Sequence, residues 1–328
     1  MSGGGKDWLL SILVLIALIW AAYVGRDLHQ EVRIRQLKNA EAYPAYADLL
    51  PALGCFVGML VAQLMWRPLF AVVARSMIPK KPRWSYPVWE AKIIRCCDSV
   101  FKCCYYLAMT IWCFSLLRDE KWLPRVLGGS GDTKFCWTDN YPFQAVSADM
   151  RRFYLTAVGY HLSEVAMLLL EVRHPDFWEM LLHHTVSATL VFFSYVLNYV
   201  RIGSLVLLLH GATDVLIYAS KAIVDTPATR CIVASYFALI AGYCWFRIYV
   251  FPMTIMRSAW VESLQEAGPV NVFGWGYMNF ALCMLLLLHM YWFGLIIKIG
   301  FVFRNTGQAR DLQSNLSALE LTTKKKDS

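Results

Sequence analysis

The sequence predicts an all-α polytopic membrane protein with about eight transmembrane helices. Of its 328 residues, 58% are hydrophobic and 16% are charged, whereas about a quarter of the residues of a soluble globular protein are charged. The mean hydropathy is +0.45. The apolar residues also lie in blocks of about 20, the length that a helix needs to cross about 30 Å of hydrocarbon. Composition and block length therefore point to the same class of protein.

Eight apolar runs account for these blocks. The first is interpreted as an uncleaved anchor helix, because no small-residue cleavage site stands out after it. The expected spans are residues 7–24, 47–74, 97–117, 151–172, 177–199, 202–224, 229–256 and 272–303. They divide the chain into an N-terminal region of two helices and a basic linker (1–91), a domain of six helices (92–304) and a polar, disordered tail (305–328).

Basic residues between the spans set the expected orientation, because Lys and Arg are enriched in cytosolic loops. The linker between the second and third spans is strongly basic and should be cytosolic, whereas the loop at 257–271 has one base beside two acids and should be lumenal. Both termini then face the cytosol, and residues 119–149 form the one sizeable lumenal loop. Lys325 and Lys326, fourth and third from the end, resemble a dilysine retrieval signal and predict residence in the endoplasmic reticulum membrane.

Charge argues against a nucleic-acid-binding protein, and cysteine content argues against a disulfide-rich protein. The net charge of +8 is explained by cytosolic loops, and no clustered basic face predicts nucleic-acid binding. The ten cysteines do not indicate a disulfide framework. Half of them lie in apolar runs, where a free Cys packs as a small hydrophobe. The pairs at 96–97 and 103–104 fit no standard zinc spacing.

Three neighbouring spans each carry a stripe of side chains at helical spacing, mostly polar. In the fourth span these are Tyr154, His161, Glu164 and Glu171; in the fifth, His184, Ser187, Val191, Ser194 and Asn198; in the sixth, His210, Asp214, Tyr218 and Lys221. Titratable groups are costly in a bilayer, so they rarely face lipid. We therefore expect the three stripes to point together into an enclosed cavity.

The adjacent histidines His183 and His184 carry most of the chemical information. If the fifth span runs from the cytosol to the lumen, they lie one to two turns inside the membrane. Asp214, on the returning sixth span, lies about 20 Å from the lumenal side and so reaches a similar depth. A carboxylate beside an imidazole fixes its tautomer and stabilises the imidazolium, which is how histidine assists acyl transfer.

Three other interpretations of these histidines stay open on the residues alone. The pair can be interfacial side chains near a helix end. Three His and an Asp are able to bind zinc, although seven histidines in the chain are few for a membrane di-iron hydroxylase. The stripes can also line a transport path, but the sequence has no repeated halves and no paired broken helices.

The stretch HHTVSATLVFFSYVLNYVRIGSLVLLLHGATDVLIYASK resembles the signature of ceramide synthases, within the TLC-domain family. The matching positions are His183, His184, Ser194, Tyr195, Asn198, Arg201, Gly203, His210, Asp214 and Lys221. The segments WTDNYPFQAVSADMRRFYL, RIYVFPMTIMRSAWVES and LLLLHMYWFGLIIKI also resemble the family. The resemblance covers about Lys92 to Phe303, and it implies a catalytic domain of six helices in a TLC-type barrel around an intramembrane cavity.

The resemblance implies N-acylation of a sphingoid base by a fatty acyl-CoA, giving ceramide or dihydroceramide and CoA, with no cofactor and no metal. His183, His184 and Asp214 are then the catalytic residues: one His takes the acyl group or acts as general base, and Asp214 balances the imidazolium. Candidates for supporting or substrate-binding roles are His210, Tyr218, Lys221, Ser187, Ser194, Asn198, Arg201, His161 and Glu164. Candidates for contact with the CoA phosphates are Arg95, Arg173 and Lys221.

Two departures from the family pattern affect this interpretation. The family usually has His-Asp where this chain has His210-Gly211, so one of two expected carboxylates is missing. The linker at 79–92 is also too short for the homeobox-like insert of some animal members. The alternative is therefore a TLC-domain protein that binds, senses or moves membrane lipid without catalysis. The sequence leaves open a homodimer, a heterodimer or an accessory subunit.

Overall fold

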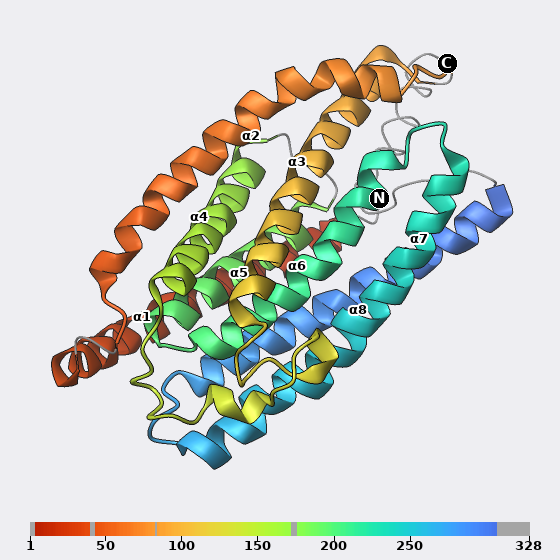
Figure 1. Cartoon of the computed structure of the whole chain (residues 1–328). Helices are drawn as coiled ribbons and strands as arrows, with labels where there is room; N and C mark the ends of the chain where they lie inside the picture. Colours follow the sequence, from red (N-terminus) through yellow and green to blue (C-terminus); the bar gives the residue numbers. More distant parts are fainter. Residues whose placement is uncertain (1–3, 40–42, 83, 172–175, 307–328) are drawn as a thin grey trace.

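The computed structural model describes residues 4–39, 43–82, 84–171 and 176–306. They form a bundle of long helices joined by short turns and one longer loop (Figure 1). The helices are α1 (Gly4–Lys38), α2 (Leu50–Met77), α3 (Tyr86–Leu117), α4 (Ala148–Leu170), α5 (Phe177–Val196), α6 (Val200–Ile223), α7 (Thr229–Tyr243) and α8 (Trp275–Thr306). Two π-helical segments, η4 (Cys244–Met256) and η5 (Ser258–Ala267), continue α7, and short 3-10 segments occur at η1 (Tyr46–Leu49), η2 (Arg125–Leu127) and η3 (Thr133–Cys136).

Six helical segments in the described residues are long and apolar enough to cross a membrane, so the predicted polytopic α-helical class is confirmed. They are Tyr46–Met77, Tyr86–Leu117, Ala148–Leu170, Val200–Ile223, Thr229–Ala267 and Trp275–Asn305. Helices α1 and α5 also lie where spans were expected but are not in this set. Charged residues in the second half of α1, and Glu179 and the two histidines in α5, make them more polar.

Three helix ends differ clearly from the prediction. Helix α1 runs on to Lys38, beyond the expected residue 24. Helix α3 begins at Tyr86, before the expected residue 97, because Pro87 favours the first helical turn and Val88 and Ile93 are buried in a cluster with Ala74 of α2 and with Ile78 just after it. The seventh helix runs on to Ala267, through most of the loop expected at 257–271. Its extension stays helical because Ser258, Ser263 and Glu262 are buried against the rest of the fold.

Helices α3 to α8 close into a barrel. Helix α3 packs along α6, α6 along α7, and η4 against α8; α8 then packs on α5, α5 on α4, and α4 on α3. Helix α2 lies outside this ring against α3 and α4, and α1 packs on α5. The end of α2, the start of α3, the end of α6 and the end of α8 lie toward one end of the bundle (Figure 1). The six-helix barrel implied by the resemblance is therefore present.

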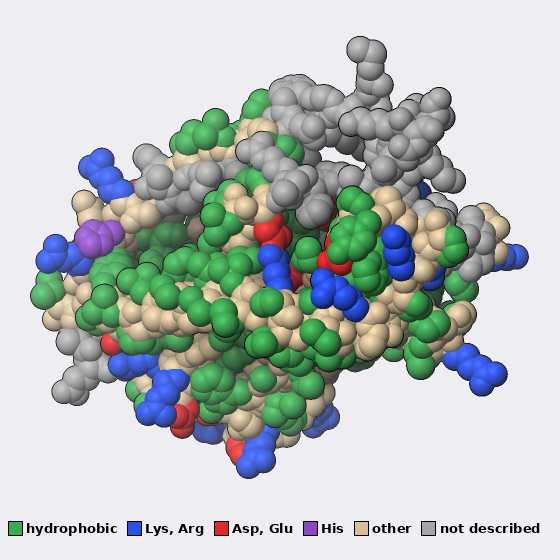
Figure 2. All heavy atoms as spheres, turned by 90° about the horizontal axis from the view of Figure 1, so that it is seen from above, with side chains coloured by type: hydrophobic (Ala, Val, Ile, Leu, Met, Phe, Trp, Pro, Cys, Tyr) green, Lys and Arg blue, Asp and Glu red, His purple; other side chains and the backbone are tan. Residues whose placement is uncertain are grey.

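The outer surface of the bundle is apolar. Leu69, Val72 and Leu170 are 69%, 70% and 73% exposed. Figure 2 shows hydrophobic side chains over much of one face, with many of the Lys and Arg side chains toward its margins. Exposed apolar patches of this extent are not tolerated in water but suit contact with lipid. All ten cysteines are free, as expected for a chain without a disulfide framework.

The turn between α5 and α6 is fixed by Asn198. This residue has φ 57°, in the left-handed region that Asn tolerates better than most residues. Its buried Nδ2 donates to the carbonyls of Pro142 at 2.6 Å and Gln144 at 2.9 Å. One turn further on, Gly203 lets α6 approach α4 closely, because a Cβ there would lie 1.9 Å from the hydroxyl of Tyr154. The signature residues at this end of the barrel are therefore explained by packing.

We predict that Asn198→Ala destabilises the protein more than Asn198→Gly. Both changes remove the two buried hydrogen bonds, at a cost of about 1–3 kcal/mol, but only Ala also strains the left-handed backbone, which adds about 1 kcal/mol. Thermal unfolding of the purified variants in one detergent measures both effects. Equal stability of the two variants would show that the backbone conformation at this turn imposes no constraint.

Candidate active site

The two adjacent histidines of α5 point to different places in the barrel. His183 lines a cavity of about 540 Å³, whereas His184 does not contribute to its lining. His184 is buried, and its Nε2 lies 4.0 Å from Oε2 of Glu164 on α4. Adjacent residues of an α-helix are separated by about 100° around its axis, which explains the divergence.

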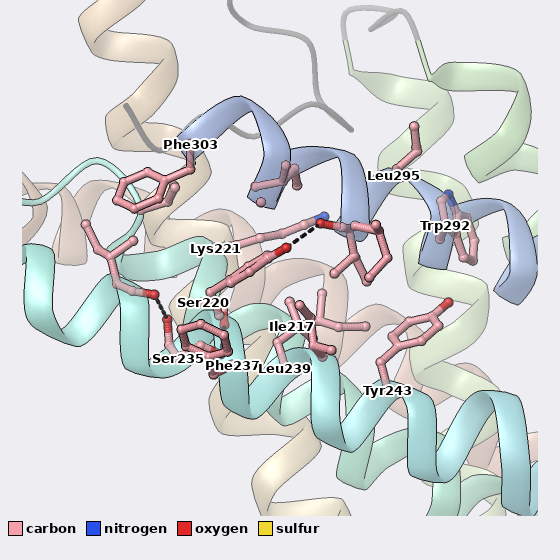
Figure 3. A pocket seen from close by; sticks show the side chains of 18 of the residues that line it. Ile217, Ser220, Lys221, Ser235, Phe237, Leu239, Tyr243, Trp292, Leu295 and Phe303 are labelled. Atoms are coloured by element: carbon pink, nitrogen blue, oxygen red, sulfur yellow. Dashed lines mark hydrogen bonds between the residues drawn. The ribbon is translucent and has the colours of Figure 1, made fainter. Parts of the chain in front are cut away.

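The cavity lies between α5, α6, α7 and α8, and we call it the central cavity. Figure 3 shows side chains from α6, α7 and α8 that line it, among them Lys221, Tyr243 and Trp292. Most of its wall is apolar, but it has a small group of titratable side chains: His183, Asp214, Tyr218, Lys221 and Arg247. The structure therefore brings together four of the predicted site residues and adds Arg247.

Asp214 is held by an arginine and, among the described residues, is not hydrogen-bonded to a histidine. Its Oδ1 accepts a hydrogen bond of 2.6 Å from Nη2 of Arg247, and Nη1 of Arg247 lies 2.9 Å from Nε2 of His289. Nε2 of His210 also lies 3.2 Å from Nε2 of His289. Nδ1 of His210 donates to the carbonyl of Val206 at 2.8 Å. These contacts join α6, η4 and α8 in one buried polar network.

Two members of this network, Arg247 and His289, were not among the predicted site residues. Arg247 and His289 are 2% and 0% exposed, and both lie in segments that were noted only as flanking matches. A titratable residue in an apolar span was the available signal. Their partners were not predictable, because helical spacing says which residues share a face but not which helix that face meets.

A second polar group lies on the other side of α5. Lys102 of α3 donates to Oε2 of Glu164, the oxygen nearest His184. Four tyrosines surround it: Tyr105 stacks on Tyr160 with ring centroids 3.5 Å apart, and Tyr106 stacks on Tyr218 at 5.6 Å. The fourth and fifth spans thus meet through Glu164 and His184, but these two residues do not share the central cavity with the stripe of the sixth span.

Several other predicted site residues lie outside the central cavity. Nη1 of Arg201 donates to the carbonyl of Phe135 and to Asp139, and Ser194 contacts the hydroxyl of Tyr154 at 3.2 Å. Like Asn198, Arg201 thus binds the loop between α3 and α4, whereas Ser194 joins α5 to α4. Ser187 is buried in α5, and Nδ1 of His161 is buried with no hydrogen-bond partner in the described part of the chain.

One of the candidates for CoA contact, Arg95, does not line the cavity. Arg95 pairs with Asp225 at the end of α6, together with Lys92, so its charge is already balanced by a carboxylate. Arg173 lies outside the described residues, as do Lys325 and Lys326. Lys221 lines the central cavity, and its Nζ lies 5.7 Å from the ring centroid of Tyr218. Arg304 of α8 lines the same end of the cavity.

The departure at Gly211 has a packing explanation. A Cβ at this position would lie 2.5 Å from Oγ1 of Thr110 on α3, so the residue faces the tight contact between α3 and α6. It does not line the central cavity. Within the described residues, no group of three or more His, Cys, Asp or Glu side chains lies close enough together to hold a metal ion.

Comparison with known proteins identifies the family. The model of the TLC domain matches residues 95–298, which include both polar groups and all of the central cavity except its last lining residues on α8, among them Arg304. The chain belongs to the TLC-domain family. Within this TLC domain, the central cavity and both polar groups are formed by the six helices of the barrel.

Several curated relatives of this TLC-domain chain are named ceramide synthases. Ceramide synthase 4 of Homo sapiens is 32% identical over 221 residues, which are 67% of this chain and 54% of the relative. A ceramide synthase of Caenorhabditis elegans is 27% identical over 68% of this chain and 61% of the relative. ASC1-like protein 1 of Oryza sativa is 28% identical over 79% of this chain and 86% of the relative. The chain thus spans about half the length of the human relative.

We predict that Arg247→Met destabilises the protein by about 3–5 kcal/mol, because it leaves the carboxylate of Asp214 buried without a cation. Adding Asp214→Asn should recover part of the loss, because the amide has no charge to balance. Thermal unfolding in detergent compares the single and double variants. A double variant that is no more stable than Arg247→Met would contradict this assignment of the ion pair.

Proposed function

We propose that this chain transfers the acyl group of a fatty acyl-CoA to the amino group of a sphingoid base, forming ceramide or dihydroceramide. The observation that carries the proposal is the central cavity, where His183 lies in an otherwise mostly apolar wall. Nδ1 of His183 is buried and has no hydrogen-bond partner among the described residues. A ligand or reacting group is one explanation for such an unpaired atom. The names of the curated relatives agree with this chemistry.

The shape of the cavity suits an acyl chain with a charged end. Its lining follows α6 from Asp214 to Val224, a rise of about 15 Å. Lys221 and Arg304 line the end that lies toward the basic linker, and they are our candidates to bind the CoA phosphates there. The apolar side chains of α7 and α8 would enclose the acyl chain.

The reaction requires proton transfer at the buried site. The sphingoid base is an ammonium ion in water and has to lose a proton before its nitrogen can attack the thioester carbonyl. When the new amide bond forms, the nitrogen gives up a second proton, the carbon–sulfur bond breaks and the thiolate of CoA takes up one proton. One proton therefore leaves with each turnover, and we assign its removal to the histidine pair.

His183 is able to act in two ways. It can attack the thioester and carry the acyl group as an acyl-imidazole, or it can accept the proton of the attacking amine. In both routes negative charge develops on the carbonyl oxygen of the substrate. Arg247 and Lys221 provide positive charge along the same cavity, and Asp214 fixes the guanidinium of Arg247 in place.

We further propose that the protein resides in the membrane of the endoplasmic reticulum with both termini in the cytosol. The basic linker at residues 75–95 supports this orientation, since such loops face the cytosol. The dilysine sequence at Lys325 and Lys326 supports the location. The acyl-CoA would then enter from the cytosolic side, where the polar end of the cavity lies.

We predict that His183→Ala and Asp214→Asn each reduce ceramide formation by about 100-fold or more, the range expected for loss of acid–base or electrostatic catalysis. The assay uses purified protein in detergent, a long-chain base and a panel of acyl-CoAs, with ceramide measured by mass spectrometry. His29→Ala is the matched control, because His29 is exposed on α1 outside the barrel. Folded wild-type protein that makes no ceramide with any donor would overturn the proposal and favour a lipid-binding protein without catalysis.

The covalent and general-base routes differ in one measurable species. If His183 carries the acyl group, incubation with acyl-CoA alone should add the mass of one acyl group to the intact protein, and His183→Ala should abolish the adduct. Hydroxylamine should remove the adduct, because acyl-imidazoles are labile to it. An unmodified protein that still makes ceramide when the base is added would support the general-base route.

A further inference from the structure

The pair of Lys102 and Glu164 lies beside His184 and does not line the central cavity. Lys102 was not among the predicted site residues. The side chains of Lys102 and Glu164 are 17% and 2% exposed, and neither residue lines the cavity. Taking two charges out of water is costly, so such a pair is weak evidence for a purely stabilising role.

We propose that Lys102 and Glu164 are positioning residues for the histidine pair, an inference that rests on the proposed acyl transfer. Lys102 binds Oε2 of Glu164, and this oxygen lies 4.0 Å from Nε2 of His184. At this distance the contact is electrostatic and not a hydrogen bond, so Glu164 acts by stabilising the positive charge that the pair gains when it accepts a proton. The ring centroids of His183 and His184 are 5.3 Å apart, so this charge acts directly on the cavity histidine.

Asp214 is less suited to this role than Glu164. The carboxylate of Asp214 is bound by the guanidinium of Arg247 at 2.6 Å, and no hydrogen bond joins it to a histidine of the described residues. Glu164 keeps a free acceptor, because its Oε1 is buried without a hydrogen-bond partner in the described part of the chain. The carboxylate that can respond to a proton on the histidines is therefore Glu164.

The ring of Tyr218, which lines the central cavity, lies close to two lysines. Nζ of Lys102 and Nζ of Lys221 lie 5.6 and 5.7 Å from its centroid, and only Lys221 lines the cavity. Tyr106 stacks on the same ring with an interplanar angle of 5°. Lys102 and Glu164 thus act through His184 and do not touch the substrate. The titratable and charged groups that face Glu164 and His184 are Lys102, Tyr105, Tyr106, Tyr160, His161, His183, Tyr218 and Lys221.

The test is a set of four variants in the full-length chain: Lys102→Met, Lys102→Arg, Glu164→Gln and the double variant Lys102→Met/Glu164→Gln. We expect Lys102→Met and Glu164→Gln to lower kcat for ceramide formation by about tenfold or more while KM for acyl-CoA stays within about twofold, since the substrate does not touch either side chain. Lys102→Arg should recover most of the activity, because it restores the charge.

The double variant distinguishes a role of Lys102 through Glu164 from an independent role of Lys102. If Lys102 acts only through Glu164, the double variant should be as active as Glu164→Gln alone, and the two losses should not multiply. Losses that multiply, or an unchanged kcat in Lys102→Met, would overturn the inference. Should Lys102→Met fail to fold because it leaves Glu164 unpaired, the comparison of Lys102→Arg, Glu164→Gln and the double variant still decides between these outcomes.

The wild-type reaction distinguishes failure of this inference from failure of the proposed function. Wild-type protein that makes no ceramide contradicts the acyltransferase itself. Wild-type protein that makes ceramide, with all four variants equally active, contradicts only the positioning role. Lys80→Met is the matched control, because Lys80 is exposed on the linker before α3, whereas Lys102 and Glu164 lie inside the helix bundle.

Discussion

The buried guanidinium of Arg247 is the interaction on which the geometry of the site depends. It lies in the π-helical continuation of α7 and contacts Asp214 of α6 and His289 of α8. An unpaired charge in this setting would be prohibitively costly, so the three helices are held in one mutual arrangement. The same helices form most of the wall of the central cavity. The ion pair therefore fixes the rotation of each helix and, with it, the side chains that face the cavity.

A second consequence of helix geometry is that the two histidines have different surroundings. His183 faces the cavity and lies against Trp292, with ring centroids 4.9 Å apart, whereas His184 faces the buried pair of Lys102 and Glu164. One helix thus connects a side chain that faces the cavity to a charged group that does not line it.

Much of the fold follows from the sequence alone, because the length and spacing of apolar runs determine where helices cross a membrane. The stripe spacing also predicted that Asp214, Tyr218 and Lys221 would share one face of α6, and all three line the cavity with His183. These features depend on local periodicity, which a single sequence contains.

The rest depends on how helices are rotated against each other, which local periodicity does not contain. Ser194 and Asn198 follow the stripe of His184 but do not line the cavity: Ser194 contacts Tyr154 of α4, and Asn198 binds the loop before α4. Arg247 was the unpredicted partner of Asp214 because it comes from a helix distant in sequence. Gly211 was read as a missing carboxylate, yet it faces Thr110 across the contact between α3 and α6.

The most direct measurement is a structure of the purified chain with an unreactive thioether analogue of a fatty acyl-CoA. The account predicts that the acyl chain occupies the central cavity between α6, α7 and α8, that its first carbons lie beside His183, and that the CoA phosphates lie near Lys221 and Arg304. Density for the acyl chain on the other side of α5, beside Glu164 and Lys102, would contradict it.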